Sequence, residues 1–216
     1  MSQMKKPSKR TGRATYHHGD LASALLQAAK LELAENGLDA FSLRAVAKRA
    51  GVSHGAPAHH FKDANGLLTE LAALGYENMT ETINAYQVQA AADHGLQLVA
   101  AGVGYVDFAI ENPSLFRLMF SSERPDRNNV RFAEASGAAF DIMVTNISNL
   151  FGADPSKDPM AMRQLMVSWS LVHGLAELVI SGRAEIPLGF GQLTKAEREA
   201  VLSDIMLRAL KNTVSK

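Results

Sequence analysis

The sequence predicts an all-α protein of about nine helices, with a small N-terminal domain and a larger C-terminal one. Apolar residues recur every three or four positions along most of the 216 residues. Capping residues and glycines separate these stretches, and no segment shows the alternation of a β-strand. A core of ordinary size is expected, because 47% of the residues are hydrophobic and 20% are charged.

The N-terminal segment predicts a basic arm followed by two helices. Residues 1–16 are polar and basic without an apolar period, which is typical of a flexible arm. An apolar stripe then begins after Asp20 and ends at Gly37, a good helix stop. Ser42 is a good N-cap for a second helix of about two turns, which ends at Gly51.

The stretch after this glycine predicts a tight turn and a short third helix. Ser53 can cap that helix, and Pro57 would then be its fourth residue, where a missing N–H costs at most one hydrogen bond. Gly55 and Ala56 carry almost no side chain, so another molecule can approach this surface closely. Phe61 ends the helix and is expected to pack into the core.

The rest of the chain predicts six further helices, each with a start signal or a stop signal. Asp63 caps the first of them, Pro113 opens a short one, and Thr194 with Glu197 forms a capping box for the last. The expected helical segments lie at about 64–74, 96–110, 113–120, 132–151, 159–181 and 195–212.

The charge distribution divides the chain into unlike parts, although the formal net charge is zero. Residues 1–62 contain ten Lys and Arg against four Asp and Glu, a net charge of +6, which leaves −6 for the remainder. A basic module on an acidic body indicates a polyanionic partner for the module alone. We therefore expect a basic arm at 1–16, a helix-turn-helix domain at 17–62 and a larger helical domain at 63–216.

Several classes of protein and site do not fit this composition. The chain has no cysteine, so disulfides, thiolate catalysis and cysteine-ligated zinc do not apply. No apolar run resembles a membrane span or a secretion signal, which predicts a cytoplasmic protein. His59 and His60 are neighbours that would point about 100° apart on a helix, without a carboxylate three or four residues on. We therefore expect no metal and no cofactor.

Three stretches resemble the TetR-type (tetracycline-repressor-like) transcriptional regulators. The first is "LDAFSLRAVAKRAGVSHGAPAHHFKDANGLL" at 38–68, with the capped helix, Gly-Val-Ser turn and short helix ending in Phe of that family. "NPSLFRLMF" at 112–120 and "WSLVHGLAELVISG" at 169–182 resemble a subgroup named for a Trp-His-Gly motif. The resemblance implies an all-helical homodimer with an N-terminal DNA-binding domain and a C-terminal effector domain.

For DNA binding, the resemblance implies that the third helix enters the major groove of a palindromic operator. Lys48 and Arg49 would add attraction to the DNA backbone, while Ala58 and Ala64 replace residues with which the family usually contacts phosphate. The candidate DNA-binding residues are Lys9, Arg10, Arg13, Ser42, Arg44, Ser53, His54, Gly55, Ala56, His59, His60 and Lys62.

For effector binding, Trp169, His173 and Glu177 fall at i, i+4 and i+8 on one helix face. They predict either a polar seam in a ligand pocket or a packed core or dimer interface in which His173 is only hydrogen-bonded. Phenylalanines and methionines would suit an adaptable lipophilic pocket. The further pocket candidates are Phe108, Phe116, Met119, Phe120, Phe140, Met143 and Met166.

The leading hypothesis is a repressor that a small, lipophilic effector releases from double-stranded DNA, and not an enzyme. The resemblance places the dimer contact on the last two helices, at about 159–181 and 195–212. One alternative is a DNA-binding dimer without an effector. Another is an all-helical enzyme or sequestering protein that uses His173 and Glu177, although no nucleophile pair, carboxylate pair or phosphate loop is visible.

Overall fold

The computed structural model describes residues 18–214, and this part of the chain is all-helical, without a β-strand. It forms ten α-helices and one 3₁₀ turn, Phe190–Gln192. The α-helices are α1 (His18–Asn36), α2 (Leu43–Arg49), α3 (Ala56–Phe61), α4 (Ala64–Gln89), α5 (His94–Glu111), α6 (Pro113–Phe120), α7 (Val130–Phe151), α8 (Pro159–Ile180), α9 (Glu185–Leu188) and α10 (Lys195–Val214). The predicted fold class is thereby confirmed.

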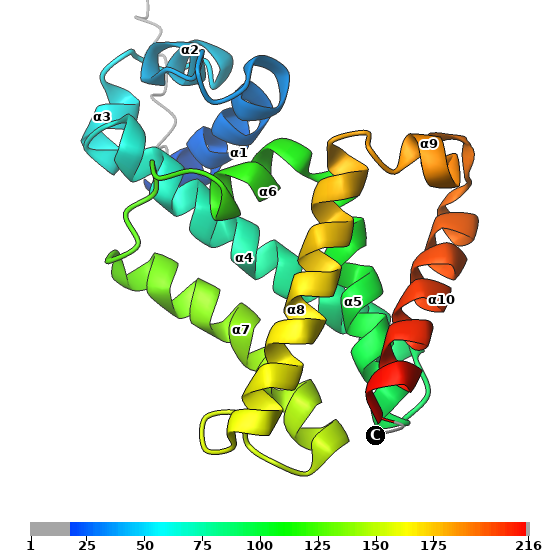
Figure 1. Cartoon of the computed structure of the whole chain (residues 1–216). Coiled ribbons are helices and arrows are strands. Elements are labelled where there is room, and N and C mark those ends of the chain that lie inside the picture. The colour runs from blue at the N-terminus through cyan, green and yellow to red at the C-terminus, as the bar shows by residue number, and fades with distance from the viewer. Residues whose placement is uncertain (1–17, 215–216) are drawn as a thin grey trace, which may run out of the picture.

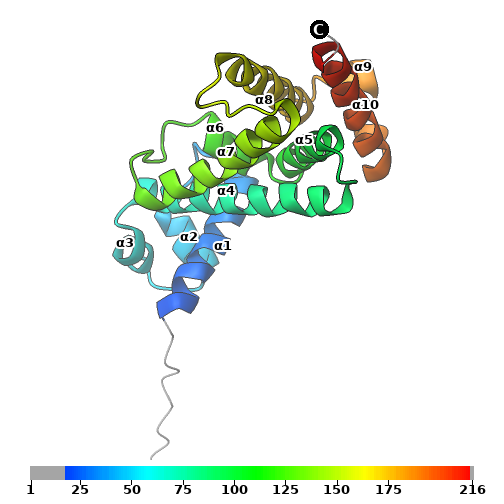
Figure 2. The same cartoon turned by 90° about the horizontal axis from the view of Figure 1, so that it is seen from below.

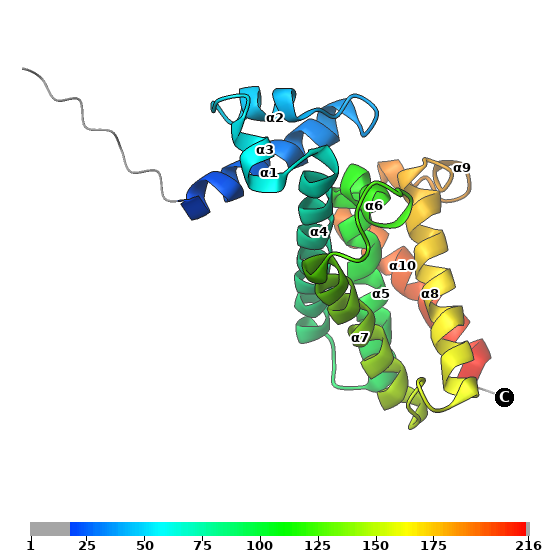
Figure 3. The same ribbon diagram turned by 90° about the vertical axis from the view of Figure 1, so that its left-hand side faces the viewer.

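The helices form two groups joined by the long helix α4 (Figure 1). Helices α1, α2 and α3 gather around the first turns of α4 at one end of the molecule. Helices α5 to α10 surround the remainder of α4, and Figure 3 shows them extending away from the N-terminal group. Because α4 belongs to both groups, a displacement of its C-terminal half also moves the N-terminal group.

Helix α5 lies at the centre of the larger group. It packs against α4 and α7 on one side and against α8 and α10 on the other, as the view from below shows (Figure 2). One hydrophobic cluster runs without interruption from Leu25 in α1 through Leu71 in α4 and Phe108 in α5 to Leu202 in α10. This continuous core ties the two groups of helices together.

Local signals place several helix starts where the sequence predicts them, but α4 continues to Gln89, well beyond the expected segment at 64–74. The Asp63 carboxylate accepts a hydrogen bond from the amide of Gly66 at the start of α4, and Asp158 caps α8 in the same way. Gly152 ends α7 in the left-handed conformation. The predicted capping box is also present, because Thr194 and Glu197 exchange hydrogen bonds at the start of α10.

One helix is additional to the expected set. Helix α9 spans only four residues between α8 and α10, in a stretch that its glycines and Pro187 mark as a loop. Gly182 and Gly189 flank it with positive φ angles of 74° and 57°. Each glycine reverses the chain there, so the segment between them is just long enough for one helical turn.

Candidate DNA-binding surface and ligand cavity

Helices α2 and α3 form the predicted helix-turn-helix. The Ser42 hydroxyl accepts a hydrogen bond from the amide of Ala45 at 3.2 Å, which caps α2. Gly51 has a φ of 68° and reverses the chain after α2. The amide of Val52 then donates to the carbonyl of Ala47 at 3.0 Å, which closes a tight turn.

The start of α3 differs from the prediction. Ser53 does not cap the helix, which begins at Ala56 after Gly55, and Gly55 makes no side-chain capping bond. Pro57 is therefore the second residue of α3 rather than the fourth. A proline in that position gives up no intrahelical hydrogen bond, because the first N–H groups of a helix have no partner within it.

A strained turn connects α3 to α4. Lys62 has a φ of 70° and a ψ of −61°, and the amide of Asp63 donates to the carbonyl of Phe61 at 2.8 Å. These values describe a γ-turn with positive φ, which is rare for a residue with a side chain. Within residues 18–214, Lys62 is the only residue other than glycine with a positive φ. The turn fixes the orientation of α3 relative to α4.

We expect Lys62→Gly to raise the free energy of unfolding by about 1 kcal/mol, because glycine adopts this conformation without the strain. Lys62→Ala is the matched control, since it removes the same charge but keeps a Cβ atom in the strained turn. Urea unfolding of the two variants measures the difference. Equal stabilities would show that the turn stores no strain.

Most of the candidate DNA-binding side chains lie together on the exposed surface of this module. Ser42 and Arg44 lie at the start of α2, and the others follow from the turn to the end of α3. Ser53, His54, Gly55, His59 and Lys62 are exposed, while Ala56 and His60 are half-buried. Lys9, Arg10 and Arg13 lie outside the described residues.

Arg49, which was expected to attract the DNA backbone, forms ion pairs with two glutamates of α1. Its guanidinium donates through Nε and Nη2 to Oε2 of Glu32 on α1, at 3.2 and 3.1 Å, and also pairs with Glu35. The hydrogen bond from Arg49 holds the pKa of the Glu35 carboxyl below its usual range. Arg49 thus connects α2 to α1, and its charge is compensated there.

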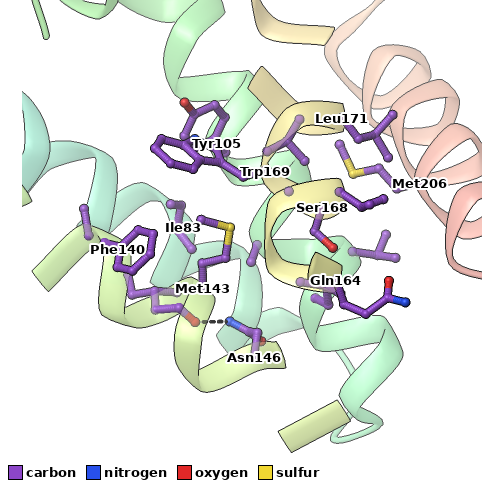
Figure 4. A pocket seen from close by; sticks show the side chains of 18 of the residues that line it. Ile83, Tyr105, Phe140, Met143, Asn146, Gln164, Ser168, Trp169, Leu171 and Met206 are labelled. Carbon is purple, nitrogen blue, oxygen red and sulfur yellow. Dashed lines mark hydrogen bonds between the residues drawn. The ribbon is translucent and has the colours of Figure 1, made fainter. Parts of the chain in front are cut away.

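A cavity of about 230 Å³ lies within the larger helical group, between α4, α5, α6, α7, α8 and α10 (Figure 4). Its wall consists of aliphatic, aromatic and small uncharged side chains. The lining residues are Tyr76, Met79, Ile83, Leu98, Val99, Ala101, Gly102, Tyr105, Phe120, Ser136, Ala139, Phe140, Ile142, Met143, Asn146, Phe151, Gln164, Val167, Ser168, Trp169, Leu171, Val172, Met206, Ala209 and Leu210.

Four of the ten sequence-based pocket candidates belong to this wall, namely Phe120, Phe140, Met143 and Trp169. The rings of Phe140 and Trp169 meet edge to face with centroids 5.9 Å apart. This contact joins α7 to α8 across the cavity, where Figure 4 shows both side chains.

The other six candidates lie outside the wall, for two different reasons. Phe108, Phe116 and Met119 are at most 1% exposed and fill the core around α5 and α6. Met166 points outward on α8 and is 46% exposed. His173 and Glu177, the remaining two, lie on the same helix beyond the cavity wall.

His173 sits behind the wall in a cluster of aromatic rings. Its Nδ1 atom lies 2.8 Å from the hydroxyl of Tyr105, and its ring stacks on Phe116 at 5.5 Å. Burial raises the pKa of the Tyr105 phenol, against an opposing hydrogen bond with Trp169. Tyr105 therefore remains a neutral phenol that joins the cavity to His173. The Oε1 atom of Glu177 is buried, and it has no hydrogen-bond partner among the described residues.

Helix α6 and the loop after it lie between the cavity and the DNA-binding module. The Tyr76 hydroxyl in the cavity wall donates to the carbonyl of Met119 in α6 at 3.3 Å. In the following loop, Arg124 donates to the side chain of Asn65 at 2.7 Å, and the amide of Asp126 donates to Thr69 at 2.9 Å. The cavity is thus connected by direct contacts to the first turns of α4, next to α3.

Two kinds of feature are missing from residues 18–214. No group of three or more His, Asp or Glu side chains there is arranged to hold a metal ion. No helix in the same range combines the length and the apolar composition that crossing a membrane requires.

Comparison with known families agrees with this architecture. Residues 25–71, from α1 into α4, match the family described as bacterial regulatory proteins, tetR family. Residues 98–201, which supply most of the cavity wall, match the tetracyclin repressor-like, C-terminal domain. The chain belongs to the TetR family. It is a DNA-binding regulator with a helix-turn-helix and a ligand-binding C-terminal domain. The narrower Trp-His-Gly subgroup stays a prediction, because neither family description names it.

Solved structures of several bacterial proteins have the same fold. A protein of unknown function from Rhodococcus sp. RHA1 is 28% identical with a TM-score of 0.72, over 91% of this chain and 98% of its own. A tetR family transcription regulator from Shewanella sp. PV-4 is 18% identical with a TM-score of 0.62, over 88% and 97% of the two chains.

The TetR family transcriptional regulator PfmR from Thermus thermophilus is also 18% identical, with a TM-score of 0.60 over 85% of this chain and 97% of its own. No curated protein matches this chain.

Proposed function

We propose that this TetR-family regulator is a repressor that a small lipophilic effector releases from a palindromic operator. The observation that carries the proposal is the apolar cavity, which opens inside the domain that shares α4 with the helix-turn-helix. An effector binds best to one arrangement of the cavity walls and therefore stabilises the orientation of α4 that goes with it. Because α3 is attached to α4, the orientation of α3 changes as well. DNA binding and effector binding then oppose one another by linkage.

On DNA, α3 would lie in the major groove with its N-terminal residues nearest the bases. His54, Gly55, Ala56 and His59 are the residues proposed to face base edges. Ser42, Arg44, Ser53, His60 and Lys62 are proposed to contact or face the phosphate backbone. The small side chains at the start of α3 allow the helix to approach the groove closely.

Dimerisation is proposed through α8 and α10, which both pack on α5. Five large apolar residues of α8 are exposed in the single chain: Met160 at 59%, Met162 at 36%, Met166 at 46%, Val167 at 55% and Leu178 at 47%. Met160, Val167 and Leu178 share one face of the helix, and an exposed apolar face is typical of a surface that a second copy covers. A dimer would present two α3 helices to half-sites about one helical turn apart.

The first experiment selects binding sites from random duplex DNA with the full chain at about 150 mM salt, where non-specific attraction is partly screened. An enriched palindrome, together with a dimer mass in sedimentation, supports a dimeric sequence reader. If no sequence is enriched and the protein shows only salt-sensitive binding to all duplexes, the proposed operator recognition is wrong. The operator then serves as the probe for release by effectors, and a lack of release by any cavity ligand would favour a DNA-binding dimer without an effector.

Arg44→Ala tests the proposed phosphate contact. We expect affinity to fall by a similar factor for the selected operator and for unrelated duplexes, with a salt slope reduced by about one. Lys157→Ala, which removes an exposed cation in the loop before α8, is the control and should leave both quantities unchanged. A change in sequence preference at constant salt slope would instead place Arg44 on a base.

A further inference from the structure

The ligand cavity contains no charged side chain in its described wall. Its lining residues include no Asp, Glu, Lys, Arg or His, although they come from six helices. The titratable groups that the wall does contain are the phenols of Tyr76 and Tyr105. Burial raises the pKa of Tyr76 to about 12 and also raises the pKa of Tyr105, so both stay neutral. The wall therefore offers no counter-charge to an ionised ligand.

Most of the polar groups in the wall are already used within the chain. The side-chain amide of Asn146 donates to the carbonyl of Ile142 at 2.8 Å and accepts from Gln87 at 2.9 Å. The Ser136 hydroxyl donates to the carbonyl of Ala133 at 3.2 Å. These groups have few hydrogen-bonding positions left for a ligand.

Two lining side chains are different, and both belong to α8. Gln164 and Ser168 lie one helical turn apart, and neither side chain forms a hydrogen bond with another described residue. Figure 4 shows both on the same helix, with Phe140 and Met143 on the α7 side of the cavity. The cavity thus has an aromatic and aliphatic body and one neutral polar position, which can both donate and accept hydrogen bonds.

From this arrangement we propose that the cavity binds an uncharged, hydrocarbon-rich molecule with one neutral polar group, such as a hydroxyl or carbonyl, placed at Gln164 and Ser168. Carboxylates and ammonium ions are rejected, because a charge without a partner loses its hydration on entry. The inference rests on the proposed function, in which this cavity is the effector site. It adds to that function the statement that the ligand is uncharged.

A homologous set of ligands tests the proposal on the full chain. N-phenyl-1-naphthylamine, a neutral apolar fluorophore, reports occupancy of the cavity, and 1-decanol, decanoate and decyltrimethylammonium compete with it. We expect 1-decanol to displace the fluorophore at a concentration lower than either ion needs by roughly tenfold or more. Displacement by decanoate at the same concentration as by 1-decanol would overturn the proposal.

Substitutions in the cavity wall test whether the ligands bind at the proposed site. Ala139→Trp fills the cavity and should remove most fluorophore binding, whereas unchanged binding would show that the fluorophore sits elsewhere and overturn the assignment. Gln164→Lys should improve competition by decanoate and Gln164→Glu competition by decyltrimethylammonium. Val88→Lys adds a charge at a position that is 85% exposed and outside the wall, and should change neither. If Gln164→Lys improves competition by decanoate no more than Val88→Lys does, the polar group of the ligand does not bind at Gln164.

Release of operator DNA is measured separately, by fluorescence anisotropy with the same three ligands. If 1-decanol fills the cavity and the DNA complex persists, the effector role fails while the ligand class stands. If an ion fills the cavity best and releases DNA, the proposed function stands and the ligand class fails. The two failures are therefore distinguishable.

Discussion

Gly66→Ala is expected to destabilise the helix-turn-helix by about 3 kcal/mol and to weaken operator binding. A Cβ atom at Gly66 would lie 2.0 Å from the carbonyl oxygen of Phe61. That oxygen cannot move away freely, because it accepts the hydrogen bond of Asp63 that closes the γ-turn. The substitution must open the junction between α3 and α4.

Gly137→Ala is the matched control for this prediction. Gly137 lies within α7, and a Cβ atom added there meets no other atom within 4 Å. Alanine should therefore raise stability by up to about 1 kcal/mol through its higher helix propensity. Urea unfolding compares the two variants without any DNA. Similar stabilities for both would mean that the junction between α3 and α4 yields easily and does not hold the orientation of α3.

Several helix starts could be predicted from the sequence because the interactions that set them are local, whereas the end of α4 at Gln89 has no such signal. Asp63, Asp158 and the pair Thr194 and Glu197 each bond to backbone groups within three residues, so the sequence pattern contains both partners. The start of α3 was predicted less well. Ser53 has the chemistry of a cap, but the restricted backbone of Pro57 competes with it and the helix begins later.

The ligand cavity could not be predicted in detail, because it depends on how helices far apart in the sequence lie on α5. Met79, Ile83 and Met206 have the spacing of ordinary core residues, yet they line the space. Gly102 shows the reason, since a Cβ atom there would lie 2.7 Å from the sulfur of Met206. Its missing side chain lets α10 approach α5 closely, and no local pattern reveals that contact.

Arg49→Ala is expected to lower the free energy of unfolding, because it leaves the carboxylate of Glu32 without its cation. Glu32 is only 6% exposed and keeps a single side-chain donor, Asn36 at 2.9 Å. The loss is smaller than for a fully buried pair, because 27% of the Arg49 side chain reaches solvent. Urea unfolding measures the loss, and adding Glu32→Gln should restore part of it.

Lys48→Ala provides the control, since Lys48 is the neighbouring cation on α2 and is exposed without an ion pair in the described chain. It should leave stability within about 0.5 kcal/mol of the unmodified chain. The two interpretations of Arg49 predict different results. A phosphate contact would lower the salt slope of DNA binding by about one at unchanged stability. A structural pair lowers stability and leaves the salt slope of the remaining folded protein unchanged, because the charge of Arg49 is already compensated by Glu32 and Glu35.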